Sequence, residues 1–472
     1  MDVVIAGGGI AGLTCGAALA DAGLRVALYE ANPHCGGRAS TFKDATTGDA
    51  VDIGPHVVTT EHRNFLSLLS RVGTDGDVLW QPNPLITLLD DRRILRMHAL
   101  RWPPPLHGLP SLRNALRCVS MADLWSNRRI AWHAARTSDS ALMTLDAIDA
   151  LSYLRQMRVS ERFITWFWRS ATMALLNVPL AQCSAASLMR VFRLLLGRSR
   201  YSFGFPRTGL SDLFVPGCVR AIEKAGGAVH NSERVVRPLL RHGRFAGFQL
   251  EHGREVLAQA GVLALTPQAL SEMSAPRADA PAWLGRTERD LAKFSPTPYV
   301  STTLWFDTKV THERFWARVW AEGDLNTDFY DLSNIRANPK SHSTIAANAI
   351  HAHSAAAMSD ADVVDRTLRE IEEFAPDAAH AAVVHARVHR IPMAIPSPEP
   401  GTESLRPNVV SALPGLFLAG DWTATGLPCS MESAARSGAL AAERAAAASG
   451  LTLRLAHPPP DTQAPVAWLR QP

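Results

Sequence analysis

Apolar runs separated by glycine-rich turns open the chain. Residues 3–6 are all apolar, which is typical of a strand buried on both faces of a sheet. Residues 13–22 are mostly small or apolar, and this pattern predicts a helix that ends at Gly23. Residues 25–29 predict a second buried strand that closes on Glu30. A strand, a helix and a strand in this order predict an α/β sheet at the N-terminus.

The same type of pattern returns twice. Residues 221–266 fit a helix, a strand, a hairpin and a buried strand. Near the C-terminus an apolar run stops at Gly420 and Asp421, and a helix is predicted to start near Met431. These α/β-type pieces lie far apart in the chain.

Two longer stretches separate these pieces. Residues 91–214 have a mostly helical pattern, whereas residues 271–394 mix strand and helix. Within the second stretch, residues 299–307 predict a strand and residues 360–376 an amphipathic helix. Residues 457–472 are rich in proline, which predicts a loosely packed tail.

Composition fits a globular protein of two or three structural units. The chain has 472 residues, of which 47% are hydrophobic and 19% charged. The net charge of +4 gives no case for general binding to nucleic acid. No pair of the six cysteines forms CxxC and no spacing fits zinc, so we expect free thiols in a reducing compartment and no metal. The sequence contains no apolar stretch long enough to cross a bilayer, so a membrane span is not predicted.

The turn after the first strand carries candidate chemistry. Gly7, Gly9 and Gly12 fit G-x-G-x-x-G between a strand and a helix. These glycines allow a tight turn, close approach of a pyrophosphate and close helix packing, and the helix N-terminus faces the phosphate charge. Glu30 ends the next strand, where a carboxylate accepts hydrogen bonds from a ribose diol. The spacing predicts a dinucleotide site, with a glycine-rich turn that binds nothing as the alternative.

The continuation after Glu30 selects the dinucleotide. The segment EANPHCGGRAS adds Gly36, Gly37 and Arg38. This arrangement resembles the flavoprotein superfamily of amine oxidases, carotenoid desaturases and related isoprenoid oxidoreductases. The resemblance implies FAD as the cofactor and places Arg38 near the flavin, a solvated loop arginine being the alternative.

The resemblance also implies the fold. It is an α/β fold in which a Rossmann-like FAD-binding domain of the amine-oxidase (GR2) type is interleaved with an α+β substrate domain and a helical membrane-facing subdomain. Residues 1–90, 215–270 and 395–450 would form the FAD-binding domain. Residues 91–214 would form the helical insert, and residues 271–394 the substrate-binding insert.

The resemblance predicts which residues bind FAD. Asp421 is expected at the ribityl–phosphate region, and Met431 starts a helix aimed at the flavin ring. The backbone of Val235 is expected at the adenine, with a core valine as the alternative. The full set is Gly7, Gly9, Ile10, Ala11, Gly12, Glu30, Ala31, Gly36, Gly37, Arg38, Val235, Gly420, Asp421, Ser430 and Met431.

The segment LAGDWTATGLPCSMESAARSG separates branches of the superfamily. Flavin amine oxidases place a tyrosine directly before the Met-Glu of the last helix, as half of a cage for the amine, whereas this chain has Ser430. The segment resembles the plant-type carotenoid desaturases, and most of all the bacterial squalene-associated branch, the hydroxysqualene dehydroxylases. VDIGPHVV (51–58) and RWPPPLHGLPSL (101–112) resemble segments of the same branch.

This resemblance implies a long-chain isoprenoid substrate, hydroxysqualene, reduced to squalene for squalene and hopanoid biosynthesis. His56 and Arg38 are the candidates for protonating or hydrogen-bonding the leaving hydroxyl, with a structural histidine as the alternative for His56. A carotenoid-type desaturase, acting on a substrate like phytoene or ζ-carotene in the oxidative direction, has the same motifs. An amine oxidase and a non-enzymatic prenyl-lipid chaperone are less favoured. The sequence does not identify the electron donor.

Residues 92–136 combine arginine with tryptophan. Nine arginines accompany a single acid, Asp123, and three tryptophans are interleaved with them. This composition is typical of helices in a membrane interface, so we expect a cytoplasmic protein attached peripherally to the inner face of the cell membrane. A solvated helical face with core tryptophans is the alternative. No nucleic-acid-binding motif accompanies these charges.

A second aromatic segment covers residues 158–179. Phe163, Trp166, Phe167 and Met173 fall on one broad face of the predicted helix. Such a stripe belongs either to the core or to the wall of a tunnel for an apolar substrate.

Overall fold

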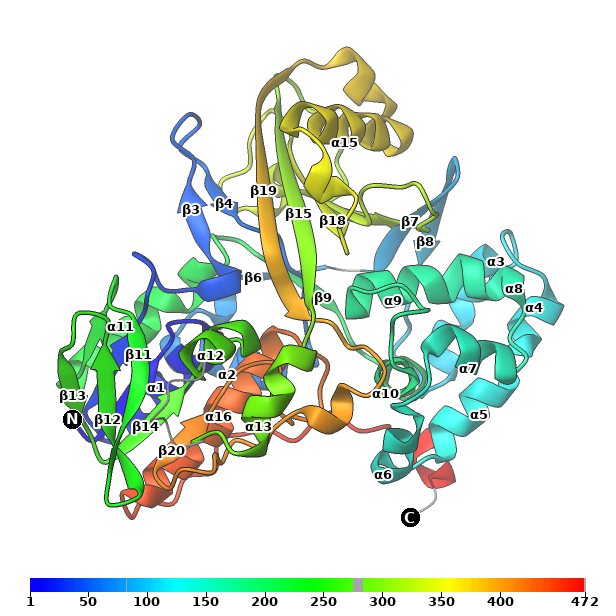
Figure 1. Ribbon diagram of the computed structural model, residues 1–472. Helices are drawn as coiled ribbons and strands as arrows, with labels where there is room; N and C mark the ends of the chain where they lie inside the picture. Colours follow the sequence, from blue (N-terminus) through cyan, green and yellow to red (C-terminus); the bar gives the residue numbers. More distant parts are fainter. Residues whose placement is uncertain (82, 275–282, 471–472) are drawn as a thin grey trace.

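A parallel sheet of five strands forms the lower lobe of the molecule (Figure 1). The computed structural model describes residues 1–81, 83–274 and 283–470. The strand order is β10-β2-β1-β14-β20, and all neighbours are parallel. The strands are β1 (Val3–Ala6), β2 (Val26–Tyr29), β10 (Ala228–His230), β14 (Ala260–Leu263) and β20 (Leu416–Leu418). The predicted strand–helix–strand start and the discontinuous sheet are therefore confirmed.

Different layers cover the two faces of this sheet. Val3 and Ile5 of β1 point to the helices, whereas Val4 and Ala6 point to the opposite layer, so all four strand residues are buried. The helices are α1 (Ile10–Asp21), α2 (Arg63–Val72), α11 (Val215–Lys224) and α16 (Met431–Ala448). The opposite layer holds the antiparallel strands β11 (Val235–Arg241), β12 (Arg244–Leu250) and β13 (Glu255–Leu257), with α12 (Pro267–Ser274) and α13 (Arg286–Asp290).

A mixed sheet of seven strands with α15 (Asp360–Phe374) forms the upper lobe (Figure 1). Its order is β19-β15-β18-β17-β16-β7-β8, with only β16 and β7 parallel. The strands are β7 (Ile86–Asp90), β8 (Arg93–Met97), β15 (Pro296–Phe306), β16 (Phe315–Arg318), β17 (Asp328–Asp331), β18 (Thr344–Ile350) and β19 (Val383–Pro396). The strand predicted at 299–307 and the helix predicted at 360–376 are confirmed. Short α14 (Leu332–Ile335) follows β17.

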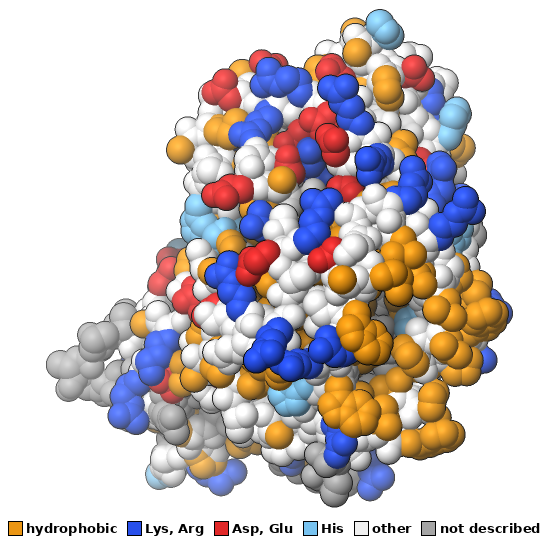
Figure 2. Space-filling model, turned by 90° about the vertical axis from the view of Figure 1, so that its right-hand side faces the viewer, with side chains coloured by type: hydrophobic (Ala, Val, Ile, Leu, Met, Phe, Trp, Pro, Cys, Tyr) orange, Lys and Arg blue, Asp and Glu red, His pale blue; other side chains and the backbone are white. Residues whose placement is uncertain are grey.

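Helices α3 to α10 form the third lobe, on the right of Figure 1. The helices are α3 (Leu109–Ala115), α4 (Met121–Ser126), α5 (Arg128–Arg136), α6 (Asp139–Leu142), α7 (Ala150–Gln156), α8 (Glu161–Phe163), α9 (Arg169–Leu176) and α10 (Ala185–Gly197). No helix in the described ranges is long and apolar enough to cross a bilayer. The side of the molecule on which this lobe lies is seen face-on in Figure 2.

Short strands connect the lobes. β9 (Phe203–Pro206) pairs with β5 (Val58–Thr59) and β6 (Val78–Trp80), and β3 (Thr41–Lys43) pairs with β4 (Ala50–Asp52). The hairpin of β7 and β8 belongs to the seven-stranded sheet, so the expected boundary at residue 90 falls inside that hairpin. The reason is edge pairing, because β7 adds to β16, a strand that lies within residues 271–394.

The proline-rich tail differs from the prediction. The His457 N–H donates to Asn64 Oδ1 at 2.8 Å, and the Gln463 N–H donates to the Gly197 carbonyl at 2.7 Å. A final turn, Val466–Leu469, packs against α5 with Val466 buried. The expectation of a loose tail is therefore wrong as far as residue 470. Residues 471–472 of the tail and 275–282 of the substrate-binding insert lie outside the described residues.

Candidate active site

One cavity of about 1030 Å³ is lined by residues from all three lobes. It contains every residue predicted to bind the cofactor except Gly12, which lies behind the cavity wall. His56 also lines it. The structure thus brings together residues from three distant parts of the chain. Their individual contacts with FAD stay predictions.

The three fingerprint glycines have different roles in the loop between β1 and α1. Gly7 has φ +104°, and a Cβ there would lie 2.4 Å from the Ala264 carbonyl oxygen. A Cβ on Gly12 would lie 1.9 Å from the Gly7 carbonyl oxygen, whereas a Cβ on Gly9 would meet nothing within 4 Å. Gly7 and Gly12 therefore allow close backbone packing, and Gly9 leaves an open cradle in the cavity.

The start of α1 suits an anion in that cradle. Gly9 caps the helix without a side-chain hydrogen bond, and its first turn contains no acidic residue. The first N–H groups of a helix have no intrahelical acceptor and carry the positive end of the helix dipole. Gly9, Ile10 and Ala11 present this helix end to the cavity. The cradle therefore fits the pyrophosphate of a dinucleotide.

Glu30 is held at the end of β2 by backbone donors. Its Oε2 accepts the Gly8 N–H at 2.7 Å, and its Oε1 accepts the Asn32 N–H at 2.8 Å. The carboxylate is buried but lines the cavity beside Ala31. Oε1 also accepts the Asn32 side-chain amide at 2.7 Å, so Oε2 is the oxygen that keeps acceptor capacity for a ribose hydroxyl. The predicted geometry of an acid at a strand end is present.

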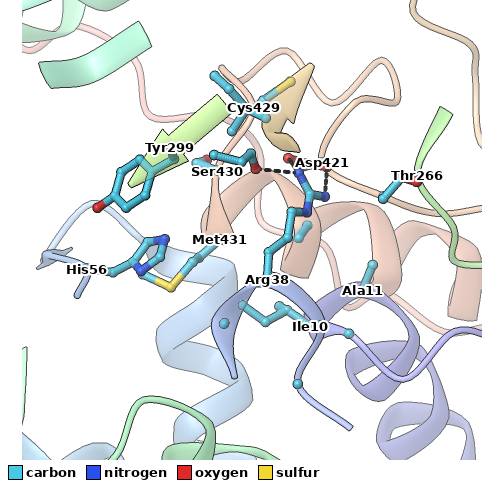
Figure 3. Close-up of a pocket in the computed structure, with 18 of the residues that line it drawn as sticks. Ile10, Ala11, Arg38, His56, Thr266, Tyr299, Asp421, Cys429, Ser430 and Met431 are labelled. Carbon is cyan, nitrogen blue, oxygen red and sulfur yellow. Dashed lines mark hydrogen bonds and ion pairs between the residues drawn. The ribbon is translucent and has the colours of Figure 1, made fainter. Parts of the chain in front are cut away.

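Arg38 and Asp421 form the central ion pair of the cavity (Figure 3). The guanidinium donates Nη2 to Asp421 Oδ1 at 2.6 Å and Nη1 to Asp421 Oδ2 at 3.0 Å. Nη1 also donates to the Ala394 carbonyl at 2.8 Å. Burial opposes the charge on Arg38, but Asp421 outweighs it and the pKa of Arg38 is raised. Arg38 is thus a permanent cation fixed in place, and it is not a solvated loop residue.

A buried arginine that the sequence patterns did not single out holds the loop after Asp421. Arg406 donates to the carbonyl oxygens of Asp421, Trp422, Thr423 and Leu427 at 2.6 to 3.2 Å. Glu403 pairs with Arg406 at 3.2 Å. The loop that carries Asp421 has no regular secondary structure. The side-chain hydrogen bonds of Arg406 therefore hold it in place. Arg406 lies in a loop without a recognisable motif, so only its tertiary contacts reveal it.

Ser430 caps the last helix. Its Oγ accepts the Ser433 N–H at 3.2 Å, and its backbone is extended, with φ −171°. Helix α16 begins at Met431, and in Figure 3 both residues lie at the cavity near Asp421. The first turn of α16 thus faces the cavity, where its N–H groups can stabilise negative charge. A serine in this position gives a good N-cap, but it provides no aromatic wall.

The part of the cavity away from the glycine cradle has mainly apolar walls. Val57, Ile86, Phe203, Phe315 and Ile350 line it, with Ala174 and Leu175 of α9. The predicted aromatic stripe contributes none of its four side chains to this wall. Phe163 and Trp166 are buried in the helical core, Phe167 packs against that core, and Met173 packs behind Tyr299. Only the last turn of α9, which follows the stripe in the sequence, lines the cavity.

His56 lies on the cavity wall beside Tyr299 (Figure 3). Its Nδ1 is 2.7 Å from the Gly54 carbonyl oxygen. Because a carbonyl only accepts, Nδ1 carries the hydrogen and Nε2 carries the lone pair of the neutral ring. Burial lowers the pKa of His56. The neutral ring suits accepting a proton at Nε2, and it does not suit the predicted role of proton donor.

A buried acid lines the same wall, and the sequence patterns did not predict it. Asp328 accepts the Thr327 hydroxyl at 2.6 Å and the Asn348 amide at 2.8 Å, and it has no basic ion-pair partner in the described part of the chain. Burial raises the pKa of Asp328 against these hydrogen bonds. Burial and the charge of Asp328 raise the pKa of both Tyr299 and Tyr330, which also line the cavity. Asp328, Tyr299 and Tyr330 are named the acid–tyrosine cluster below.

A glycine cradle at the carboxyl ends of a parallel sheet, opening on an apolar cavity, fits an oxidoreductase that binds a dinucleotide cofactor. The pattern of the family described as flavin containing amine oxidoreductase matches residues 10–446. The chain belongs to this family, and FAD is its cofactor. The residues of the cradle fit that cofactor.

Relatives cover nearly the whole chain. The 15-cis-phytoene desaturase of Solanum lycopersicum is 24% identical over 473 residues, 94% of this chain and 77% of its own. The hydroxysqualene dehydroxylase of Sinorhizobium fredii is 26% identical over 454 residues, 94% of this chain and 98% of its own. These similarities confirm the superfamily, but they do not establish the substrate.

Solved structures have the same fold at low identity. Cyclohexylamine oxidase from Brevibacterium oxydans superposes with a TM-score of 0.67 at 18% identity, over 95% of this chain and 98% of its own. An oxidoreductase from Methanosarcina mazei superposes with a TM-score of 0.65 at 16% identity, over 93% and 99%. The predicted α/β fold of the amine-oxidase type is therefore confirmed, with a parallel FAD-binding sheet and a mixed second sheet. Identities this low establish the fold and not the reaction.

Proposed function

We propose that the protein desaturates a long isoprenoid hydrocarbon, as a carotenoid-type desaturase. The observation that carries this proposal is the apolar part of the cavity, because the same cavity is lined by the FAD cradle and by His56. The similarity to phytoene desaturases over 94% of the chain supports the same substrate class. An amine oxidase is less well supported, because Ser430 provides no aromatic ring at the start of α16.

Desaturation removes a hydride and a proton from neighbouring carbons. The glycine cradle, Glu30 and Arg38 would hold FAD, which would supply a hydride acceptor for the hydrogen that leaves one carbon with the electron pair of its C–H bond. The apolar walls hold the chain and exclude water, so that a reactive carbon is kept beside the flavin. His56 takes the proton at Nε2, which carries its lone pair, and the second electron pair forms the double bond. Arg38 and the N-terminus of α16 stabilise negative charge beside the flavin.

A single-turnover experiment tests the proposal. FAD-loaded protein is mixed without oxygen with vesicles that contain 15-cis-phytoene, so that bound FAD is the only oxidant. We expect the visible flavin absorbance to fall and one equivalent of a product with an additional double bond to appear. His56→Phe and His56→Gln are both expected to keep the FAD absorbance and abolish the product, because neither a phenyl ring nor an amide can take up the proton. Unchanged absorbance with phytoene would contradict the proposal.

Dehydroxylation of hydroxysqualene is the second candidate, because the acid–tyrosine cluster favours it. A hydrocarbon offers nothing to a buried carboxyl group, whereas a leaving hydroxyl needs a proton donor. The raised pKa of Asp328 keeps its carboxyl group protonated at a higher pH than usual. In this reaction the C–O bond breaks with its electron pair, the hydroxyl leaves as water with the proton of Asp328, and the carbon receives a hydride from reduced FAD. The relative from Sinorhizobium fredii matches over 98% of its length.

The direction of electron flow separates the two candidates. Protein whose FAD has been reduced chemically is mixed with hydroxysqualene in the absence of oxygen. Squalene together with returning flavin absorbance supports dehydroxylation, and Asp328→Asn is then expected to slow it at least tenfold. Turnover with phytoene but not with hydroxysqualene supports desaturation. Turnover with neither substrate would contradict both candidates.

A further inference from the structure

Large apolar side chains stand out from one face of the helical lobe. They come from the turn-rich segment before α3, from α3, α4 and α5, and from the final turn Val466–Leu469. Figure 2 shows this side of the molecule, on which hydrophobic side chains gather with basic side chains at the margin. We name this surface the tryptophan face and define it by Trp102, Leu109, Met121, Trp125, Trp132 and Trp468. Contiguous exposed apolar patches mark surfaces that meet a partner or a membrane.

The tryptophans of this face are not core residues. Trp132 of α5 is 53% exposed, while Ile130 and Ala134 on the other side of the same helix are fully buried. Each helical tryptophan has an arginine above its ring, with Arg128 5.6 Å from the centroid of Trp125 and Arg136 4.9 Å from that of Trp132. Such cation–π pairs keep both groups together at the surface. The alternative of core tryptophans is therefore wrong for residues 92–136.

The tail adds a tryptophan from the other end of the chain. Trp468 is 79% exposed, the highest value of any large hydrophobic side chain in the described residues. The turn that carries it is anchored by buried Val466 and by the Gln463 N–H bond to the Gly197 carbonyl. It packs against α5, which carries Trp132. Two segments from distant parts of the chain therefore expose tryptophan on one surface.

The charge of the surface is one-sided. Arg113, Arg117, Arg128 and Arg129 are exposed, and none has a carboxylate within ion-pair distance among the residues that the structure describes. The only acid of residues 92–136, Asp123, accepts hydrogen bonds from Ser120 and Ser160 instead. Unpaired arginines beside exposed tryptophans match a layer of anionic headgroups above a hydrocarbon edge.

The face also adjoins the wall of the cavity. The Arg200 Nε donates to the Arg101 carbonyl at 3.4 Å, and the Tyr201 ring packs against His107, with centroids 6.1 Å apart. Shortly after Tyr201, Phe203 lines the cavity. Leu175, which also lines the cavity, is 45% exposed. An apolar surface beside an apolar cavity fits uptake of a substrate from lipid.

We propose that the tryptophan face lies in the interfacial layer of an anionic bilayer, with the C-terminal turn as part of the contact. The arginines lie at the phosphates, and Trp125, Trp132 and Trp468 lie at headgroup level. This contact does not depend on the identity of the substrate. A second protein or a second copy of this chain is the competing occupant, and the test distinguishes them.

The test uses the full-length, FAD-loaded protein and flotation with vesicles. Wild type is expected to float with vesicles that contain phosphatidylglycerol and to stay behind with pure phosphatidylcholine. Each arginine contributes about fivefold, so replacing Arg113, Arg117, Arg128 and Arg129 by Gln lowers binding by roughly a hundredfold or more. Trp468→Ser lowers it by about tenfold. The matched control Arg241→Gln/Arg244→Gln, at exposed positions of the β11–β12 hairpin, leaves binding unchanged.

Two further measurements make the outcome decisive. Brominated lipids quench tryptophan fluorescence in wild type more than in Trp468→Ser, and FAD absorbance shows that every variant is folded. Equal flotation of wild type and variants would overturn the proposal. A dimer in sedimentation that the same substitutions dissociate, without flotation of the wild type, would assign the face to a second copy and also overturn it.

Discussion

Removing Arg38 is expected to destabilise the protein through the partner that is left behind. The Asp421 side chain is only 4% exposed, and both of its oxygens accept from Arg38. Arg38→Met therefore leaves a buried carboxylate without a counter-charge. Breaking a buried pair from one side costs about 3–5 kcal/mol in general; since Arg38 is 30% exposed, we expect the lower end, about 3 kcal/mol.

A double-mutant cycle isolates the pair. Asp421→Asn keeps one acceptor for Arg38 and leaves that side chain access to water, so it is expected to cost about 1–2 kcal/mol. In Arg38→Met/Asp421→Asn no buried charge remains, and the double variant is expected to be more stable than Arg38→Met alone. The coupling measures the interaction itself. Urea unfolding followed by tryptophan fluorescence gives the four free energies, and flavin absorbance reports FAD retention.

An exposed ion pair provides the matched control. Arg155 and Glu161 are joined by two hydrogen bonds like those of Arg38 and Asp421, but both side chains are more than half exposed. Arg155→Met is therefore expected to leave stability unchanged within error. If Arg38→Met is as stable as wild type, or if the two single changes add without coupling, the pair is not the support inferred from the geometry.

Three further predictions concern other parts of the site. Gly12→Ala is expected to lower both stability and FAD affinity, because its Cβ would meet the Gly7 carbonyl, whereas Gly9→Ala is expected to lower only FAD affinity. Thermal unfolding of the apoprotein measures the stability, and FAD titration measures the affinity. Burial opposes ionisation of Glu403, but Arg406 and Arg190 hold its pKa at about 2. The charged form of Glu403 therefore stabilises the fold at neutral pH, and this contribution is lost as pH falls from about 4.5 towards 2. Unfolding at several pH values is expected to show Glu403→Gln about 3 kcal/mol less stable than wild type at neutral pH, with the difference vanishing in acid. With hydroxysqualene as the substrate, Asp328→Asn is expected to keep the FAD absorbance and shift the pH profile of turnover, because it removes the titrating carboxyl group.

Each of these three predictions has a result that contradicts it. An apoprotein of Gly9→Ala as unstable as that of Gly12→Ala would mean that Gly9 packs against the chain rather than facing the open cradle. A stability difference for Glu403→Gln that does not change with pH would place its effect outside ionisation. An unchanged pH profile with hydroxysqualene in Asp328→Asn would leave Asp328 with a structural role, through its hydrogen bonds to Thr327, Asn348 and Tyr330.

The cofactor half of the site could be predicted because its signals are local. Gly7, Gly9 and Gly12 lie close together in one short segment, and Gly7 and Gly12 are glycines because a Cβ would meet neighbouring backbone. The end of β2 places Glu30 next to that segment through parallel pairing, which is a general property of such sheets. The local spacing of the glycines and the parallel pairing of β1 with β2 were therefore sufficient to predict this half of the site.

The substrate half could not be predicted in the same way. Asp328 reaches the cavity because β17 pairs with β18, and nothing in its neighbouring residues distinguishes it from other strand acids. The stripe of residues 158–179 showed that a helix face is apolar, but not which neighbour it meets. The tail was misjudged because its anchors, Asn64 and Gly197, lie far away in sequence. Pairing between distant segments decides all three cases.

The order of strands in the lower sheet has a consequence for how the protein is made. β1 and β2 leave the ribosome first, but their neighbours β14 and β20 come only in the second half of the chain and near its end. The early strands must wait as an unpaired edge, and such edges associate with other chains. We therefore expect the nascent chain to depend on chaperones until residue 448, the end of α16, has emerged. The quenching of flavin fluorescence that accompanies FAD binding would then appear in a single late step of synthesis, after the five-stranded sheet is complete.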